Sequence, residues 1–267
     1  GFLADKYLGN RKAIAFGALL LVAGHLTMGL HGPEAKQHID LDGARYELVV
    51  EGRGGGRQVF VDTGTQRCLF GGTPAEGTCT ANVTPDGGLA FTGLDAGSPL
   101  PQVIPDITSK LSEPERSSFF TNILFLALSL IVMGVGYLKA SISSIVGQLY
   151  EENDVRRDAG FTLYYYGINL GGFWAAILCG YLGQTVGWWA GFGLAAVGMA
   201  LGWLVFARRR LLFWTAGEPQ LPDAAGAPPE PEKLKKKVLG PINLEWALYL
   251  IAIPGVAIIW YLIQSPQ

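Results

Sequence analysis

Residues 134–173 read GVGYLKASISSIVGQLYEENDVRRDAGFTLYYYGINLGGF, and they join two long apolar runs through one charged loop. A helix that crosses the ~30 Å hydrocarbon core of a bilayer needs about 20 mostly apolar residues. Lys139 lies well inside the first run, where an unpaired ammonium costs roughly 2.5–3.5 kcal/mol on insertion scales. A charge at that depth indicates a bundle interior or a water-filled cavity between membrane-spanning helices.

The composition supports a membrane protein with several spans. The chain has 267 residues, of which 49% are hydrophobic and only 16% are charged, against about 25% charged in a soluble domain. Five apolar segments are each expected to form a membrane-spanning helix: 13–30, 119–147, 161–182, 188–207 and 244–263. We therefore expect an all-α membrane protein. We also expect a fragment of a longer chain, because Gly1 falls inside a basic loop motif.

The basic residues of the short loops predict how these spans are oriented. Lys and Arg are in excess in cytoplasmic loops, and three loops carry them here: residues 6–12, 156–157 and 208–237. All three fall on one side if each segment crosses once, and we assign that side to the cytoplasm of a bacterial inner membrane. Residues 32–117 then lie in the periplasm. The basic residues flank the membrane, so we expect contact with the lipid bilayer and no nucleic-acid partner.

Residues 32–117 read as a small β-rich insert between the first two spans. The runs ARYELVVEG (44–52) and RQVFVDTG (57–64) are typical of strands, and RGGG (53–56) favours a hairpin turn between them. The insert holds Cys68 and Cys79, and an exported compartment permits oxidation. We expect a Cys68–Cys79 disulfide, the alternative being two free thiols. Without nearby His or further Cys, we expect no metal site.

These features divide the chain into five parts. They are a loop motif with a first helix (1–31), the insert (32–117), three helices (118–207), a cytoplasmic linker (208–241) and a further helix (242–267). The linker is rich in Pro, Ala and charged residues and shows no apolar periodicity. Because such composition is typical of disordered or loosely held segments, we expect no fixed structure there.

Two further polar residues are expected to share the depth of Lys139. Lys139 lies eleven residues before Tyr150, and Asn169 lies eleven residues after Asp158, which places both about 16 Å from the cytoplasmic face at ~1.5 Å per residue. Tyr165 lies one turn from Asn169 on the same helical face. An ammonium, a carboxamide and a hydroxyl suit a small zwitterion or an amide-bearing solute. Lys139, Tyr165 and Asn169 are therefore candidate substrate-binding residues, the alternative being a purely structural pair between Lys139 and an acidic residue elsewhere.

Charged residues of two cytoplasmic loops are candidates for a gate. Asp5 and Arg11 flank a glycine-bounded turn, and Arg156, Arg157 and Asp158 supply matching charges on the next cytoplasmic loop. Ion pairs between the loops would hold helix ends together in an inward-closed state, a structural or gating role. The chain contains no HExxH, GxSxG or phosphate-loop pattern, so we expect no enzyme and no catalytic residue.

The same residues resemble a known family. Residues 1–14, GFLADKYLGNRKAI, resemble the loop between helices two and three of the major facilitator superfamily, in the form found in proton-dependent oligopeptide transporters. Residues 134–173 are similar to that family's signature region. Its helix-four pattern is Lys-Pro-Asn-Ile-Ser, whereas this chain has Lys139 followed by Ala-Ser-Ile-Ser. Its helix-five pattern, Phe-Tyr-x-x-Ile-Asn-x-Gly-Ser-Leu, is similar to residues 164–171 and departs from this chain at Gly172 and Phe173.

The resemblance implies a helical bundle of the major facilitator superfamily, of which this chain holds helices three to six and either helix seven or an inserted helix. It implies a proton-coupled symporter that imports di- and tripeptides by alternating access, with protons as the coupling ion and no cofactor. Lys139 would serve proton coupling and the peptide carboxylate, while Tyr165 and Asn169 would line the peptide site. A transporter of nitrate or another small anion, a receptor that uses the insert, and the oligomeric state are left open.

Overall fold

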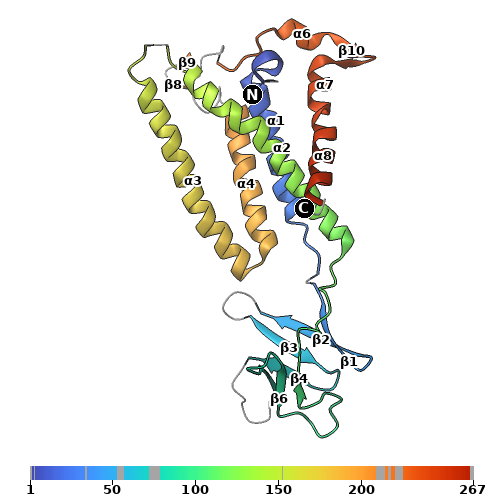
Figure 1. The fold of residues 1–267 in the computed structure, drawn as a ribbon. Coiled ribbons are helices and arrows are strands. Elements are labelled where there is room, and N and C mark those ends of the chain that lie inside the picture. The colour runs from blue at the N-terminus through green and yellow to red at the C-terminus, as the bar shows by residue number, and fades with distance from the viewer. Residues whose placement is uncertain are drawn as a thin grey trace. The chain divides into compact units, whose positions relative to one another are not determined.

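The computed structural model describes residues 2, 4–33, 35–52, 57–71, 79–151, 153–208, 214–215, 218–219 and 225–264. The chain forms two compact units (Figure 1). One unit combines Gly1–His31 with Thr121–Gln267 and is helical, and the other is Gly32–Phe120 and contains a β-sheet. The first unit fits the expected helical membrane protein, and the second unit adds a sheet to the chain.

The helical unit is built from the apolar segments of the sequence. After a π-helical turn at Ala4–Leu8, its main helices are α1 (Asn10–Met28), α2 (Ser118–Gln148), α3 (Arg157–Thr185), α4 (Trp188–Ala207) and the consecutive pair α7 (Leu244–Leu250) and α8 (Ala252–Gln264). Only two residues separate α3 from α4, and Gly187 lies there with φ 147°. That backbone conformation is readily adopted only by glycine, so the sequence fixes a tight hairpin of two helices at this point (Figure 1).

Four helices in the described part of the chain are long and apolar enough to cross a membrane: Asn10–Met28, Ser118–Gln148, Trp188–Ala207 and Leu244–Gln264. The fifth expected span, α3, has 29 residues and is about 44 Å long. Its three consecutive tyrosines and Asn169 make it less apolar than the others. The span predicted for α3 therefore rests on its length and on its place between two apolar helices.

Glycines bring the helices of this unit into close contact. A Cβ atom added to Gly17 of α1 would lie 2.8 Å from the carbonyl oxygen of Gly134 in α2, and one added to Gly134 would lie 2.8 Å from that of Gly17. In the α3–α4 hairpin, a Cβ atom on Gly191 would lie 2.6 Å from the carbonyl oxygen of Cys179. Small residues at such crossings let backbones approach and stabilise helix pairs in membranes.

The described part of the linker from residue 225 onward has regular structure, although the composition of the linker predicts a loosely held segment. From residue 225 onward it forms α6 (Pro231–Lys235) and an antiparallel pair of short strands, β10 (Lys237–Leu239) and β11 (Ile242–Asn243). Another short antiparallel pair, β8 (Trp214–Thr215) with β9 (Glu218–Pro219), lies earlier in the linker sequence. Ala225 is buried with Ile14 and Ile145, and Leu234 is buried with Leu8 and Leu248. A few apolar side chains thus fix a segment whose overall composition is polar.

The second unit contains a seven-stranded sheet whose strands follow one another in sequence order. They are β1 (Gln37–Leu41), β2 (Ala44–Glu51), β3 (Gln58–Asp62), β4 (Arg67–Phe70), β5 (Cys79–Val83), β6 (Leu89–Thr92) and β7 (Val103–Ile104). All neighbours pair antiparallel except β4 and β5, which are parallel. The two runs predicted to be strands lie in β2 and β3, while the RGGG turn at 53–56 lies outside the described residues.

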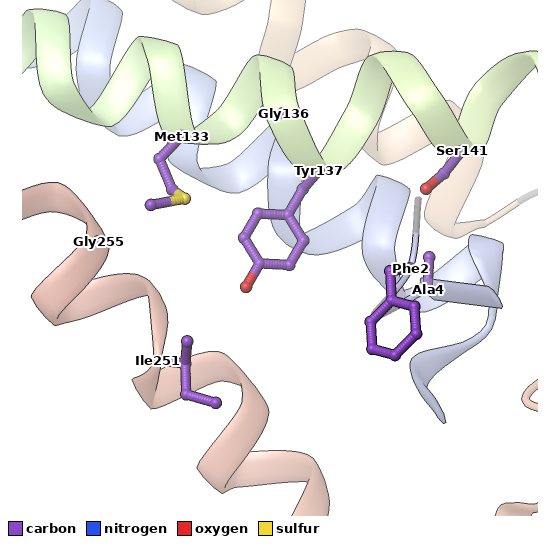
Figure 2. A pocket seen from close by; sticks show the side chains of 8 residues that line it. All are labelled: Phe2, Ala4, Met133, Gly136, Tyr137, Ser141, Ile251 and Gly255. Atoms are coloured by element: carbon purple, nitrogen blue, oxygen red, sulfur yellow. The ribbon is translucent and has the colours of Figure 1, made fainter. Parts of the chain in front are cut away.

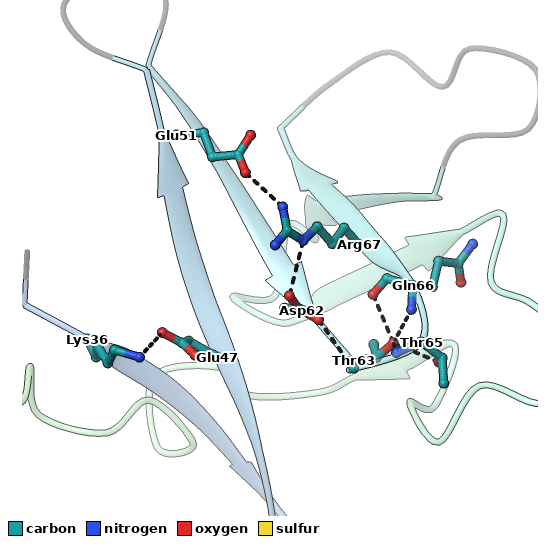
Figure 3. A network of polar contacts seen from close by, with 9 residues as sticks. Lys36, Glu47, Glu51, Asp62, Thr63, Thr65, Gln66 and Arg67 are labelled. Atoms are coloured by element: carbon teal, nitrogen blue, oxygen red, sulfur yellow. Dashed lines mark hydrogen bonds and ion pairs between the residues drawn. The ribbon is translucent and has the colours of Figure 1, made fainter.

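The sheet has an apolar buried core and charged side chains on its exposed face. Its buried centre contains Ile39, Val61 and Leu89, together with a disulfide between Cys68 and Cys79, whose Cα atoms are 4.4 Å apart on neighbouring strands. Ion pairs cross its exposed face (Figure 3), with Lys36 bound to Glu47 and Arg67 bound to both Glu51 and Asp62. Exposed pairs of this kind add little stability, so the buried residues and the disulfide hold the unit together.

Candidate functional site

Lys139 lies on α2, nine residues before the helix ends at Gln148. That spacing places it about 14 Å from the end of the helix. The residue is exposed, and its ammonium has no hydrogen-bond or ion-pair partner among the described residues. A cation inside a span and without a local partner is the feature that marks substrate and ion pathways in membrane proteins.

Tyr165 and Asn169 lie together on α3. The Asn169 side-chain amide donates a hydrogen bond to the backbone carbonyl of Tyr165 at 2.8 Å. This bond uses one donor of the carboxamide, and the Asn169 carbonyl oxygen keeps its capacity to accept. The side chain of Tyr165 is 61% exposed, and its ring packs at 5.6 Å from that of Tyr164. Both side chains of the candidate pair therefore face away from the helices of this unit.

Lys139 and Asn169 lie at similar distances from the loop that joins their helices, and no contact between them is described. Asn169 lies twelve residues after the start of α3 at Arg157, about 18 Å along the axis, against about 14 Å for Lys139. The two helices approach near their loop, where a Cβ atom on Gly147 would lie 3.5 Å from the Arg157 guanidinium. From there they spread apart (Figure 1). The polar constellation of all three residues therefore stays a prediction.

Arg11 lies at the start of α1 and contacts the linker. Its guanidinium donates to the carbonyl of Ala225, and its backbone N–H donates to the carbonyl of Gly226 at 2.9 Å. The Gly226 N–H in turn donates to the side-chain oxygen of Gln148, at the end of α2, at 2.6 Å. A Cβ atom on Gly9 would lie 2.6 Å from the backbone of Ala227. Residues 225–227 thus bridge the adjacent ends of α1 and α2.

The charges of the α2–α3 loop interact within that loop. The Arg156 guanidinium donates three hydrogen bonds to the Asp154 carboxylate at 2.7–3.2 Å. These bonds lower the pKa of Asp154 to about 2. Among the described residues, Arg156 pairs with Asp154 of its own loop, and a gating role for Arg156 stays a prediction.

The other gate candidates are placed by their helices. Asp5 is exposed in the π-helical turn before α1. Asp158 lies in the first turn of α3, where a negative charge is favoured by the positive end of the helix dipole. Arg157 is the first residue of that helix. A gating role for these residues stays a prediction.

One ion pair between helices was not predicted from the sequence. Lys12 of α1 forms an ion pair with Glu245 of α7 at 2.6 Å. Phe16 of α1 packs beside it against the ring of Tyr249, with ring centroids 4.6 Å apart, and against Tyr137 of α2 at 5.1 Å. Glu245 is the only acidic residue between 233 and 267, so its position at the start of an apolar span was the signal that could have suggested a basic partner.

These observations define a helical membrane protein with several spans and an exposed cation within one of them. A family model, that of the POT family, matches residues 11–215 of the chain. The chain belongs to the POT family.

Three curated relatives and one solved structure illustrate the likeness. Over 91 residues the chain is 48% identical to the peptide transporter YePEPT of Yersinia enterocolitica, covering 34% of this chain and 18% of that protein. Over 114 residues it is 40% identical to the di-/tripeptide transporter of Lactococcus lactis, covering 43% and 22%. Over 86 residues it is 51% identical to the uncharacterized transporter YclF of Bacillus subtilis, covering 32% and 18%. A crystal structure of the peptide transporter POT in complex with sulfate is 25% identical, with a TM-score of 0.49, covering 98% of this chain and 33% of that one.

The matched regions are therefore a minor part of each full-length relative. The aligned residues span about a fifth of the curated relatives and a third of the solved structure. All three relatives are named as transporters.

Proposed function

We propose that this chain is part of a proton-coupled symporter that imports di- and tripeptides by alternating access. Membership of the POT family supports the class of transport, and the names of two relatives, a peptide transporter and a di-/tripeptide transporter, support the substrate. The observation that carries the proposal is Lys139, an exposed ammonium within α2 that has no ion-pair or hydrogen-bond partner in the described part of the chain.

The proposed roles follow from the chemistry of each side chain. The Lys139 ammonium binds the carboxylate of the peptide and takes part in proton coupling with an acidic residue of another helix. The Asn169 carboxamide accepts from and donates to the peptide's amide groups, and the Tyr165 ring and hydroxyl line the same site. Protons are the coupling ion, and no cofactor enters the cycle. The cycle contains no catalytic step.

The surrounding parts are assigned as follows. The protein lies in a bacterial inner membrane, with the β-sheet unit in the periplasm and residues 208–241 in the cytoplasm. The helices of residues 1–31 and 118–207 form part of a bundle of the major facilitator superfamily. Asp5, Arg11, Arg156, Arg157 and Asp158 belong to its cytoplasmic gate. The contacts of Arg11 with Ala225 and Gly226 support this role, since they connect the ends of α1 and α2 through the linker.

The proposal is tested with the full-length protein in liposomes. An inward proton gradient should drive accumulation of labelled dialanine, and a protonophore should abolish it. Unlabelled dialanine should compete with the labelled substrate, whereas dialanine amide, which lacks the carboxylate, should compete weakly. Nitrate should not compete. Accumulation that ignores the proton gradient, or equal competition by the amide, would contradict the proposed coupling or the proposed role of Lys139.

A further inference from the structure

A second site lies on the side of α2 that carries Tyr137, away from the candidate peptide site. A pocket of about 300 Å³ opens between α2 and α8 and is closed by residues that precede α1. Figure 2 shows Met133, Tyr137 and Ser141 of α2 on one side of the pocket and Ile251 opposite them. Phe2 forms a further wall and is itself 69% exposed. Apart from the two hydroxyl groups, the walls are apolar.

Ser141 is the unusual member of this lining. Its side chain is fully buried, and its hydroxyl has no hydrogen-bond partner among the described residues. Two other serines of α2 behave differently, since Ser129 and Ser144 donate to the carbonyl four residues earlier at 2.7 and 3.3 Å. The Ser141 oxygen points from α2 toward the same side as the Tyr137 ring (Figure 2). Because the Ser141 hydroxyl does not make this local bond, it needs an acceptor from another source.

The pocket extends along α2 from Ser141, near the helix end at Gln148, to Met133. The 31 residues of α2 extend over about 47 Å, so a helix centred on a ~30 Å hydrocarbon core would project about 8 Å from each side. Ser141 is seven residues from the helix end at Gln148, or about 10 Å, and in that centred placement it would lie near the boundary where lipid ester groups lie. Met133 is about 12 Å deeper along the same helix. In that placement the pocket runs from the ester level into the apolar part of one leaflet.

A cation lies next to the pocket wall. The Lys6 ammonium is 5.3 Å from the centre of the Phe2 ring and 5.6 Å from that of Tyr7. It has no carboxylate partner among the residues that the structure describes. Phosphate groups of anionic lipids are attracted by such basic side chains at the membrane surface. The order from surface to interior is then an ammonium, a hydroxyl donor and an apolar pocket.

We propose that this pocket binds one acyl chain of an anionic phospholipid. The Ser141 hydroxyl donates to the ester carbonyl, and Lys6 lies beside the phosphate. Because the hydroxyl is fully covered, a side chain of the pocket wall has to move aside before lipid reaches it. The proposal rests on the membrane character of α2 and α8 and not on the transported substrate, so a failure of peptide uptake leaves it unaffected.

The test uses the full-length protein and a phosphatidylglycerol that carries a photoreactive diazirine on one acyl chain. After irradiation in liposomes, mass spectrometry should find the label on residues of α2 and α8 that line the pocket. Gly136 also lines it, and a Cβ atom there meets nothing within 4 Å. Gly136→Leu should therefore fill the pocket without disturbing packing and reduce labelling at least about fivefold. Gly202→Leu on α4, where a Cβ atom is equally unobstructed, is the matched control and should label normally.

Two variants separate the polar contacts. With the wild-type protein, unlabelled ester phosphatidylglycerol should compete about 2- to 12-fold better than its ether analogue, the range expected for one neutral hydrogen bond. Ser141→Ala should abolish that difference, and Lys6→Gln should abolish the preference for phosphatidylglycerol over phosphatidylcholine. Label outside the pocket, label unaffected by Gly136→Leu, or a pocket filled by another segment of the full-length chain would overturn the proposal.

Discussion

The contact between α1 and α2 predicts opposite effects for two glycines that are two residues apart. A Cβ atom on Gly134 would lie 2.8 Å from the Gly17 carbonyl oxygen and 3.0 Å from the Leu21 backbone nitrogen, whereas one on Gly136 meets nothing within 4 Å. Backbone atoms of a packed helix cannot rotate away as a side chain can. Gly134→Ala therefore forces the helices apart, and Gly136→Ala does not.

The magnitude follows from a comparison of the two variants. Each replacement gains the same helix propensity, about 0.8–1.0 kcal/mol in water, and this gain cancels in the difference. Overpacking of a close contact costs about 1–3 kcal/mol. Gly134→Ala should thus lower the free energy of unfolding by about 1–3 kcal/mol relative to Gly136→Ala. Gly17→Ala should behave like Gly134→Ala, and the double variant should cost less than the two single effects added, because both methyl groups separate the same helices.

The assay is reversible unfolding of the full-length protein, in which SDS is titrated into dodecyl maltoside micelles and tryptophan fluorescence is followed. Equal stability of Gly134→Ala and Gly136→Ala would refute the close approach of α1 and α2. Additive effects of Gly17→Ala and Gly134→Ala would also refute it, since independent sites do not share one contact.

Three further predictions concern the linker, the α2–α3 loop and the sheet. Gln148→Ala removes the acceptor of the Gly226 N–H and should increase trypsin cleavage of the linker. The control variant Gln102→Ala in the sheet unit should not increase it. Unchanged cleavage in Gln148→Ala would contradict the bridge between α1 and α2. The pKa of Asp154 is lowered to about 2, so its pair with Arg156 contributes its full stability at any pH above the ordinary carboxyl pKa near 3.9. This stability is lost only as the pH falls toward 2. Asp154→Asn should therefore leave the shape of the transport pH profile between pH 5 and 8 unchanged, and an altered profile would show that Asp154 titrates there. Cys68 and Cys79 should react with a maleimide in the unfolded protein only after reduction, and Cys68→Ser should destabilise the sheet unit by roughly 3 kcal/mol, as expected for a short disulfide loop; reaction without reductant would contradict the bond.

Local patterns in the sequence predicted the helices well because apolar length alone determines a span. The expected segment 188–207 coincides with α4, and 119–147 falls within one residue of α2 at each end. The start of α3 was predicted less well: the helix begins at Arg157, before the apolar run at 161. The polar first turn is stabilised by its own hydrogen bonds and needs no apolar residues.

Contacts between distant residues could not be predicted from one sequence. The linker was expected to be loose from its composition, yet Ala225 is buried with Ile14 of α1, and Leu234 is buried with Leu8. The pair Lys12–Glu245 joins residues 233 positions apart. The local pair of Asp154 and Arg156 was not predicted either, because the charges were considered only as partners for the other cytoplasmic loop. A partner of Lys139 could not be predicted either, because local sequence patterns do not say which helices lie next to each other.

The central claim is that the Lys139 ammonium serves peptide transport, and one measurement tests it most directly. Proton-driven uptake of labelled dialanine is compared between Lys139→Ala and Lys236→Ala in the full-length protein. Both lysines are exposed, but only Lys139 lies within a span. Loss of a charge that pairs with a carboxylate out of water costs about 2–5 kcal/mol, so Lys139→Ala should reduce uptake at least about 30-fold while Lys236→Ala retains wild-type uptake. Full uptake by Lys139→Ala would contradict the account.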